Sequence, residues 1–313
     1  MASETIKNLK SVMEERLSPL IDRDYILLEI PDYPNVGDML IYQGELAFLS
    51  RVGHKCLGMS TMRSFATRKP YLRKDTLLIF SGGGYFGDLW KSGHEFQRNM
   101  LEWYPDNPML ILPQSACFTS GGAIKDARRR YGNHKNLTIC LRDQVSYSFV
   151  KKNFPNNAIL APDMAFYADL RNYSVRTTCC DADLVLMRND KEQVISESLR
   201  AILRRKDVHV SDWPPMEGSL SRTEWIMRHL SAYARYCPYA ADWFVKNIYR
   251  HYLLKQGVHF LSAHRHIYST RLHGCILSLL LGKCVTAFDN SYGKIRSLYE
   301  TWLSDCELIA LAD

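Results

Sequence analysis

Short apolar runs, each followed by polar or glycine-rich residues and then by a helical pattern, recur along this chain. A run such as residues 25–30, which is apolar nearly throughout, is typical of a strand buried on both faces of a parallel sheet. The runs that we interpret as strands span residues 25–30, 76–80, 109–113, 137–141, 182–187, 208–210, 267–270 and 285–288. The pattern therefore predicts an α/β fold built on parallel sheets.

A polar, irregular stretch at residues 171–180 interrupts this strand–helix pattern. A chain of 313 residues is also long for a single hydrophobic core, which favours two domains. We therefore place one α/β domain at residues 1–174 and a second at residues 175–313. Ligands of open α/β sheets bind at the carboxyl ends of the strands, so we expect a ligand cleft between the two domains.

The composition favours a globular protein that handles anionic ligands. The chain has 40 Lys and Arg residues against 33 Asp and Glu, a net charge of +7, and no nucleic-acid-binding motif accompanies this excess. Its nine cysteines form no C-x-x-C pair, which predicts reduced thiols. Because the sequence also shows no apolar leader and no run near about 18 apolar residues, we expect a cytoplasmic protein.

A strand pattern and an apolar helical run meet at Arg271 and His273, and the helical run stops at Gly282. A helix start presents free backbone N–H groups to an anion. Arginine adds a fixed fork for phosphate or carboxylate, and histidine exchanges a proton near neutral pH. The functional interpretation is an anion site. The alternative is a surface arginine beside a helix-capping histidine.

Polar residues also follow the strand at residues 25–30. Asn35 and Asp38 stand near the start of a helix predicted from about residue 39 to residue 51, and Gly37 permits a tight turn between them. Either side chain can cap the helix, which is the ordinary role of these residue types. The functional interpretation is that Asp38 faces the ligand cleft.

Three consecutive glycines follow the strand at residues 76–80. Gly82, Gly84 and Gly87 formally match G-x-G-x-x-G, but a dinucleotide site also needs an acid after the next strand. Gln114 stands there instead, so we discount NAD. Either the glycines bring bare backbone N–H groups close to a ligand, or they form a tight turn without one.

Two further features of the sequence bear on ligands. Arg142 and Arg188 each follow a predicted strand, at the ligand edge of a sheet. His264 and His266 lie two residues apart, but no spacing rule supplies a third ligand, so no metal site is predicted.

Residues 222–255 are rich in aromatic and basic side chains. Packing within the domain is the commoner explanation of such a stretch, and contact with an anionic membrane surface is the alternative.

Several short motifs occur together and in order along nearly the whole chain. They are Asn35-x-Gly-Asp38, Gly82–Gly84, Arg142-Asp-x-x-Ser146, Ala161-Pro-Asp163, Arg188, Arg271-Leu-His-Gly274 and Gly293-Lys294. As a set they resemble the polysaccharide pyruvyl transferase family. The resemblance implies a GT-B-like fold, with two Rossmann-like domains facing across a cleft. It also implies a transferase that moves pyruvate from phosphoenolpyruvate onto a sugar of an exopolysaccharide, capsule or cell-envelope precursor as a ketal, releasing phosphate.

The resemblance also assigns roles to individual residues. The donor, phosphoenolpyruvate, would be bound by Arg188, Arg271, His273 and Lys294. The acceptor side would comprise Asn35, Asp38, Gly83, Gly84, Gln114 and Arg142. His273 would act as the acid or hold the phosphate, and Asp38 would take the proton of the sugar hydroxyl. Because two arginines suit the phosphate and the carboxylate of the donor, this scheme requires neither a metal nor a cofactor.

Two alternatives remain open. A GT-B glycosyltransferase that uses a nucleotide sugar would share the two-domain form, but only Asp289 stands near the place of an acid for the nucleotide ribose. A non-catalytic glycan-binding relative would bind ligand without releasing phosphate. The partners that the resemblance implies are phosphoenolpyruvate and a glycan acceptor, lipid-linked, with peripheral contact at the inner membrane face and no nucleic acid.

Overall fold

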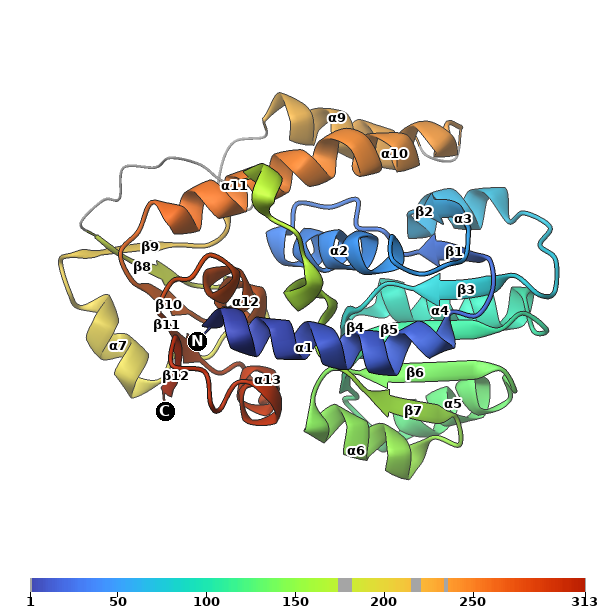
Figure 1. Cartoon of the computed structure of the whole chain (residues 1–313), viewed down its shortest axis with the longest axis horizontal. Helices are drawn as coiled ribbons and strands as arrows, with labels where there is room; N and C mark the ends of the chain where they lie inside the picture. The colour runs from blue at the N-terminus through green and yellow to red at the C-terminus, as the bar shows by residue number, and fades with distance from the viewer. Residues whose placement is uncertain (1, 174–181, 215–220, 234–235, 313) are drawn as a thin grey trace.

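The computed structural model describes residues 2–173, 182–214, 221–233 and 236–312. Two parallel sheets lie side by side, with α1 (Ala2–Leu17) running in front of them (Figure 1). The first sheet has seven strands in the order β2-β1-β3-β5-β6-β7, with β4 paired to β5, and the second has five in the order β12-β11-β10-β8-β9. The predicted α/β fold, GT-B-like with two Rossmann-like domains, is confirmed.

The elements alternate between strands and helices in both domains. The strands of the first sheet are β1 Tyr25–Leu28, β2 Cys56–Ser60, β3 Leu77–Phe80, β4 Gly83–Gly87, β5 Met109–Cys117, β6 Leu137–Leu141 and β7 Asn157–Leu160. Its helices are α2 Val36–Leu49, α3 Met62–Arg68, α4 Lys91–Trp103, α5 Gly121–Gly132 and α6 Gln144–Asn153. The second sheet contains β8 Asp183–Leu186, β9 Val208–Ser211, β10 Ile267–Ser269, β11 Val285–Phe288 and β12 Ile309–Ala312. Its helices are α7 Glu197–Leu203, α9 Arg222–Ala232, α10 Pro238–Phe244, α11 Arg250–Ser262, α12 Leu272–Leu280 and α13 Lys294–Trp302.

Side chains of β1 pack on both faces of the first sheet. Leu27 joins a core that also contains Leu184 and Leu186 of β8, whereas Ile26 and Leu28 join a second core on the opposite face. All four residues of β1 are buried, as expected for a strand covered on both sides. Because the first core continues into the second sheet, the two domains share apolar packing rather than meeting only through polar contacts.

The segment that joins the domains is only partly described. The boundary predicted at residues 174 and 175, and most of the linker predicted at residues 171–180, lie outside the described residues. The helices that follow β9 do not stay with the second sheet. In Figure 1, α9 and α10 lie above the first domain, and α10 contacts α3 while α11 contacts α2.

Two local features differ from the sequence expectations. Helix α2 begins at Val36 rather than near residue 39, because the Asn35 side chain accepts a hydrogen bond from the backbone N–H of Gly37 at 2.9 Å and starts the helix there. The glycine-rich stretch is not a turn but the strand β4, paired with β5. Gly87 has a φ of 140°, and a Cβ there would lie 1.8 Å from the carbonyl oxygen of Cys117, so only glycine allows this close approach.

Candidate active site

A cavity of about 380 Å³ lies between the carboxyl ends of the two sheets. Both domains line it, as expected for open α/β sheets. It brings together eight of the residues that the sequence singled out: Asn35, Asp38, Gly84, Arg142, Arg188, Arg271, His273 and Lys294.

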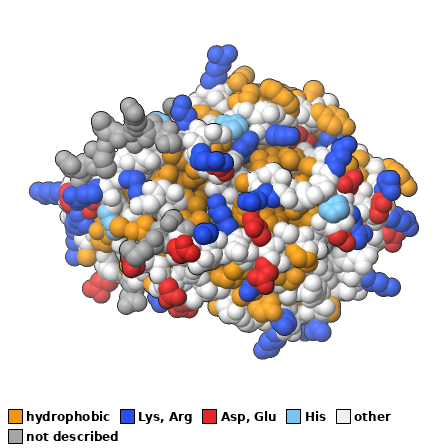
Figure 2. All heavy atoms as spheres, viewed as in Figure 1, with side chains coloured by type: hydrophobic (Ala, Val, Ile, Leu, Met, Phe, Trp, Pro, Cys, Tyr) orange, Lys and Arg blue, Asp and Glu red, His pale blue; other side chains and the backbone are white. Residues whose placement is uncertain are grey.

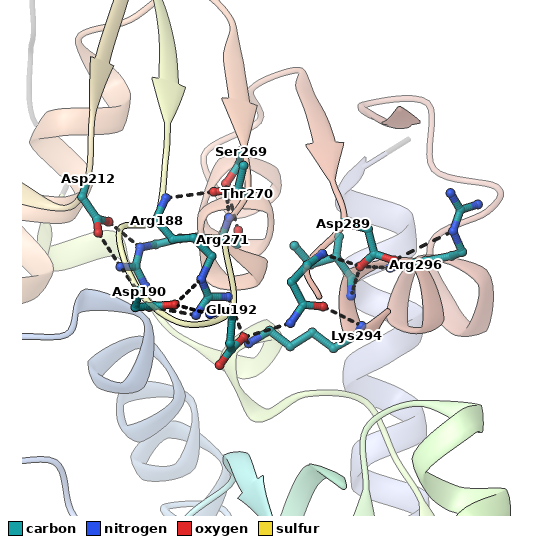
Figure 3. Close-up of polar contacts among 12 residues, drawn as sticks. Arg188, Asp190, Glu192, Asp212, Ser269, Thr270, Arg271, Asp289, Lys294 and Arg296 are labelled. Atoms are coloured by element: carbon teal, nitrogen blue, oxygen red, sulfur yellow. Dashed lines mark hydrogen bonds and ion pairs between the residues drawn. The ribbon is translucent and has the colours of Figure 1, made fainter. Parts of the chain in front are cut away.

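Arg188 and Arg271 come from neighbouring strands of the second sheet. Arg188 lies two residues beyond β8, and Arg271 is the N-cap residue of α12, directly after Thr270. Strands β8 and β10 are paired, with Leu186 opposite Ser269, so the two arginines leave the sheet side by side (Figure 3). Both are nearly buried, at 4% and 8% exposed.

The carboxylate of Asp190 lies between these two guanidinium groups (Figure 3). Arg188 donates to it from Nε at 2.9 Å and from Nη2 at 3.0 Å, and Nη2 of Arg271 lies 3.8 Å from its Oδ2. Arg271 also donates from Nε and Nη2 to both carboxylate oxygens of Asp212. Burial acts to raise the pKa of Asp190, but the hydrogen bond from Arg188 and the charges of both arginines hold it below its usual range. The arginine pair therefore already surrounds an anion.

Lys294 lies beside the arginines at the first turn of α13. Its Nζ contacts Oε2 of Glu192, which also accepts a hydrogen bond from Nη1 of Arg188 at 2.6 Å. Burial is the main reason that the pKa of Lys294 falls to about 8, although Glu192 opposes the shift. Lys294 is therefore a cation near neutral pH whose proton is held less tightly than usual.

Three side chains meet where the domains face each other. Nη1 of Arg142 donates to Oδ2 of Asp163 at 2.7 Å, and Nε2 of His273 lies 3.4 Å from the same oxygen. Burial acts to raise the pKa of Asp163, but the neighbouring His273 and Arg142 together hold it well below its usual range. Asp163 is thus an ionised partner from the first domain that orients a histidine from the second.

Gly37, in the first turn of α2, lies against His273. A Cβ on Gly37 would be 2.6 Å from Nδ1 of His273 and 2.9 Å from its Cβ. A side chain at this position would have to displace the imidazole. Glycine in the Asn35-x-Gly-Asp38 motif therefore allows the helix start and the histidine to share one wall of the cavity.

Asp38 sits on the same first turn of α2. Its Oδ2 accepts hydrogen bonds from the Tyr33 hydroxyl at 2.9 Å and from Nδ2 of Asn35 at 2.6 Å. Of the two caps that the sequence allowed, Asn35 serves as the cap and also holds Asp38. Tyr33 and Asn35 thus fix the orientation of an acidic side chain that lines the cavity.

Two residues predicted for the acceptor side, Gly83 and Gln114, are not among those that line the cavity. Nε2 of Gln114 donates to the carbonyl of Ser81 at 2.9 Å, and its Oε1 accepts from the backbone N–H of Tyr85. Gln114 therefore supports the glycine-rich stretch from within the sheet. The N–H of Gly82 is likewise used internally, by the carboxylate of Glu45 at 2.7 Å.

Sequence reasoning missed several residues that complete the cavity. They are Tyr33, Tyr85, Trp90, Asp190, Glu192 and Trp213 in the lining, and Asp212 behind Arg271. Asp212 directly follows β9 and Asp190 lies four residues beyond β8, and these positions near strand ends were the available signal. The tyrosines and tryptophans carried no comparable signal, because aromatic residues are common in any core.

The histidines considered as metal ligands lie elsewhere. Nε2 of His264 pairs with Nδ1 of His209 at 3.0 Å, and Nε2 of His266 pairs with Oγ1 of Thr286 at 2.9 Å. Within the described residues, no group of three His, Cys, Asp or Glu side chains could hold a metal ion. Over the same residues, no helix is both long and apolar enough to span a bilayer.

Comparison with known proteins decides the family. The sequence profile of the polysaccharide pyruvyl transferase family matches residues 35–292, a range that contains Asp38, Arg188 and His273. The chain belongs to this family. Relatives that carry pyruvyl transferase names match most of the chain. The Bacillus subtilis protein named "Putative pyruvyl transferase EpsO" is 29% identical over 302 residues, 93% of this chain and 90% of its own length. Pyruvyl transferase 1 of Schizosaccharomyces pombe is 26% identical, over 90% of this chain and 70% of its own.

A solved structure supports the fold of this family member. A functionally uncharacterized protein from Klebsiella pneumoniae superposes with a TM-score of 0.67, covering 98% of this chain and 99% of that one at 18% identity. At this identity the likeness concerns the fold alone. The family relationship rests on the sequence comparisons, and it agrees with the resemblance inferred from the motifs.

Proposed function

We propose that this protein transfers the pyruvyl group of phosphoenolpyruvate to two hydroxyls of one sugar in a glycan precursor, forming a ketal and releasing phosphate. The observation that carries the proposal is the placement of Arg188 and Arg271 around one carboxylate, in the cavity that His273 also lines. Membership of the family supports pyruvyl transfer in general. The donor, the ketal and the released phosphate are the parts that we infer.

The charges of the second domain suit a donor with two anionic groups. A phosphate and a carboxylate can each take a two-pronged arginine contact. Asp190 takes such a contact from Arg188 and thereby stands in for one anionic group of a ligand. Donor binding would then displace the carboxylate of Asp190, which is more exposed than that of Asp212. Asp212 would keep its hydrogen bonds with Arg271 and hold that guanidinium in place.

In the proposed reaction a residue of the second domain donates a proton and a residue of the first domain accepts one. His273 in its charged form delivers a proton to the methylene carbon of the enol, and a sugar hydroxyl adds to the neighbouring carbon while Asp38 accepts its proton. A second hydroxyl then displaces phosphate, and its proton leaves with the phosphate. One donor and one diol give one ketal and one phosphate, so the step needs no oxidant or reductant.

The nucleotide-sugar alternative has less support from the second domain. Asp289 was the acid nearest to the position expected for a ribose contact. Its Oδ1 accepts from the backbone N–H groups of Asn290, Ile295 and Arg296 at 2.8 to 3.3 Å, which secures the start of α13 (Figure 3). Asp289 precedes α13 and therefore stabilises the start of that helix by accepting from its backbone N–H groups.

Thermal stability with candidate ligands tests the proposal, because a ligand that binds only the folded protein raises the melting temperature. We expect phosphoenolpyruvate to raise it and nucleotide sugars to leave it unchanged. Phosphate release should then require both phosphoenolpyruvate and a sugar acceptor, supplied as a soluble galactoside-type mimic. Stabilisation by a nucleotide sugar alone would favour a glycosyltransferase. Donor binding without phosphate release across a panel of acceptors would favour a glycan-binding protein.

A further inference from the structure

Helices α9 and α10, together with the residues that follow each of them, present an unusual surface to solvent. Of the 13 large hydrophobic side chains that are exposed among the described residues, six lie between residues 225 and 248. They are Trp225, Tyr233, Tyr236, Tyr239, Trp243 and Ile248, between 38% and 72% exposed. We call this face the aromatic ridge. The concentration of tryptophan and tyrosine sets it apart from the rest of the surface, where exposed apolar residues are scattered.

The charges on the aromatic ridge have one sign. Within residues 222–233 and 236–255, the exposed charged side chains are Arg222, Arg228, Lys246 and Lys255. The acids of these two ranges, Glu224 and Asp242, are buried, at 6% and 8% exposed. Figure 2 shows hydrophobic side chains with Lys and Arg beside them along the upper edge, where Figure 1 places α9 and α10. The ridge is therefore complementary to an anionic surface.

The opposite side of these helices is firmly packed. Met227, Phe244, Tyr249 and Leu253 are 7% exposed or less and belong to the main core. The packing predicted for residues 222–255 therefore accounts for the inner side of the helices and leaves the outer side without an explanation. A surface held this rigidly can dock without first ordering its own backbone.

The aromatic ridge adjoins the mouth of the cavity. Ser231, near the end of α9, donates from Oγ to Asp32 at 2.6 Å, and its carbonyl accepts from Nη1 of Arg63. Each partner is one residue away from a residue that lines the cavity, Tyr33 or Met62. A flat partner resting on the ridge would thus lie close to the part of the cavity formed by the first domain.

We propose that the aromatic ridge rests on the surface of an anionic lipid bilayer and turns the first-domain side of the cavity toward it. Tryptophan and tyrosine place an apolar ring among the acyl chains and a polar atom at the headgroups, and lysine and arginine contact anionic headgroups. The docking itself follows from the exposed residues alone. That it would present a lipid-linked glycan acceptor to the cavity rests on the proposed function.

Vesicle co-sedimentation of the full chain tests the docking without any substrate. We expect binding to mixed phosphatidylcholine–phosphatidylglycerol vesicles and little binding to pure phosphatidylcholine. The double variant Trp225→Gln/Trp243→Gln should weaken binding on the order of tenfold, because it removes two half-exposed rings. Lys246→Glu should weaken it by more than about fivefold, because it removes the usual contribution of one basic residue near an anionic membrane and adds a charge that the membrane repels.

Matched variants away from the ridge serve as controls. Val145→Gln removes an apolar side chain of α6 that is 65% exposed, and Lys135→Glu reverses an exposed charge, so both should bind vesicles like the wild type. Equal binding by ridge and control variants, or no binding to anionic vesicles, would overturn the proposal. The proposal would also be overturned if the wild type self-associated and the tryptophan variant did not, because the ridge would then bind a second copy of the chain. Phosphate release with soluble substrates should be unchanged in the tryptophan variant, which separates this proposal from the proposed function.

Discussion

His273 belongs to the second domain in sequence but finds its side-chain partners in the first. Its Nε2 lies 3.4 Å from Oδ2 of Asp163 and 3.5 Å from Nη1 of Arg142, and Gly37 closes over the other side of the ring. This placement leaves the imidazole 13% exposed. A group that exchanges protons with a ligand needs such a position, oriented by neighbours yet open to the cavity.

His273→Gln separates proton transfer from phosphate binding. Glutamine keeps a hydrogen-bond donor but has no transferable proton, so we expect donor affinity near that of the wild type and turnover lower by about 10²–10⁴. Donor titration together with phosphate release measures both quantities. Normal turnover would exclude His273 as the acid. An equal loss of donor binding and turnover would make it a phosphate ligand.

Substitutions of the two arginines and of Asp190 should change the affinity for phosphoenolpyruvate in opposite directions. Arg188→Ala and Arg271→Ala should each weaken phosphoenolpyruvate binding by about 2–5 kcal/mol, since each leaves an anionic group without its partner. Arg271→Lys should restore only part of the loss, because an ammonium cannot form the two-pronged contact. Asp190→Asn should strengthen donor binding, because it removes the charge that competes for the same guanidinium groups. Calorimetry on the folded variants measures each change, and weaker binding by Asp190→Asn would show that the carboxylate only supports Arg188.

The buried carboxyl group of Glu29 should make the free energy of unfolding depend on pH. Burial raises its pKa to about 8 from 4.5, and burial likewise raises that of Glu45 to about 7. The folded protein therefore keeps protons that the unfolded chain loses near pH 4.5, so stability should fall as the pH rises from about 4.5 to about 8. The slope for each carboxyl is at most about 1.4 kcal/mol per pH unit.

Glu29→Gln should remove the upper part of this pH dependence. Glutamine stays neutral and can still accept from Gln97, which donates to Glu29 at 3.1 Å. Between pH 7 and pH 8 the Glu29 carboxyl of the folded wild type loses its proton, so the free energy of unfolding should fall less steeply there in the variant. Urea unfolding at several pH values measures it. An unchanged slope above pH 7 would show that Glu29 does not titrate there.

At the scale of elements, the start of α2 combines a structural and a site role. Asn35 caps the helix through its Oδ1 and holds Asp38 through its Nδ2. Asn35→Ala should therefore lower the free energy of unfolding by about 1 kcal/mol, as for other lost caps, and should also lower turnover. Ser120→Ala is the matched control, because Ser120 caps α5 in the same way and does not line the cavity. We expect a similar loss of stability with normal turnover. Equal turnover in both variants would confine Asn35 to capping.

At the scale of the whole molecule, α10 attaches the second half of the chain to the first domain. Asp242 of α10 accepts from Oγ of Ser60 at 3.0 Å, from the backbone N–H of Thr61 at 2.9 Å and from Nη2 of Arg68 at 2.7 Å. The Asp242 carboxylate and the Arg68 guanidinium are mostly buried, at 10% and 19% exposed. Removing one member of such a pair leaves a buried charge without a partner.

Asp242→Ala should accordingly destabilise the protein by about 3–5 kcal/mol. Asp75→Ala is the control, because it breaks an Arg–Asp pair with Arg73 that is exposed on both sides and should cost about 0–1 kcal/mol. Urea unfolding of both variants makes the comparison. Similar losses in the two variants would mean that α10 contributes little to the union of the domains.

The sequence by itself determined the local features of this protein. Apolar runs predicted the strands, because burial on both faces of a parallel sheet leaves little room for polar side chains. Polar residues at strand ends identified Asp38, Arg142, Arg188 and Arg271, because in parallel sheets such positions share one edge. The order of the motifs pointed to the family, which the comparison with known proteins then established.

Only the tertiary structure decided which of these residues meet. The partners Asp163 and His273 are 110 residues apart, and their contact depends on how the two domains pack. Gln114 and Gly83 follow the same strand-end pattern as the cavity residues, yet the pairing of β4 with β5 leaves them outside its lining. The crossing of α9 and α10 onto the first domain likewise has no local signature. These features depend on contacts between distant segments, because side chains far apart in sequence become neighbours only through the packing of whole elements.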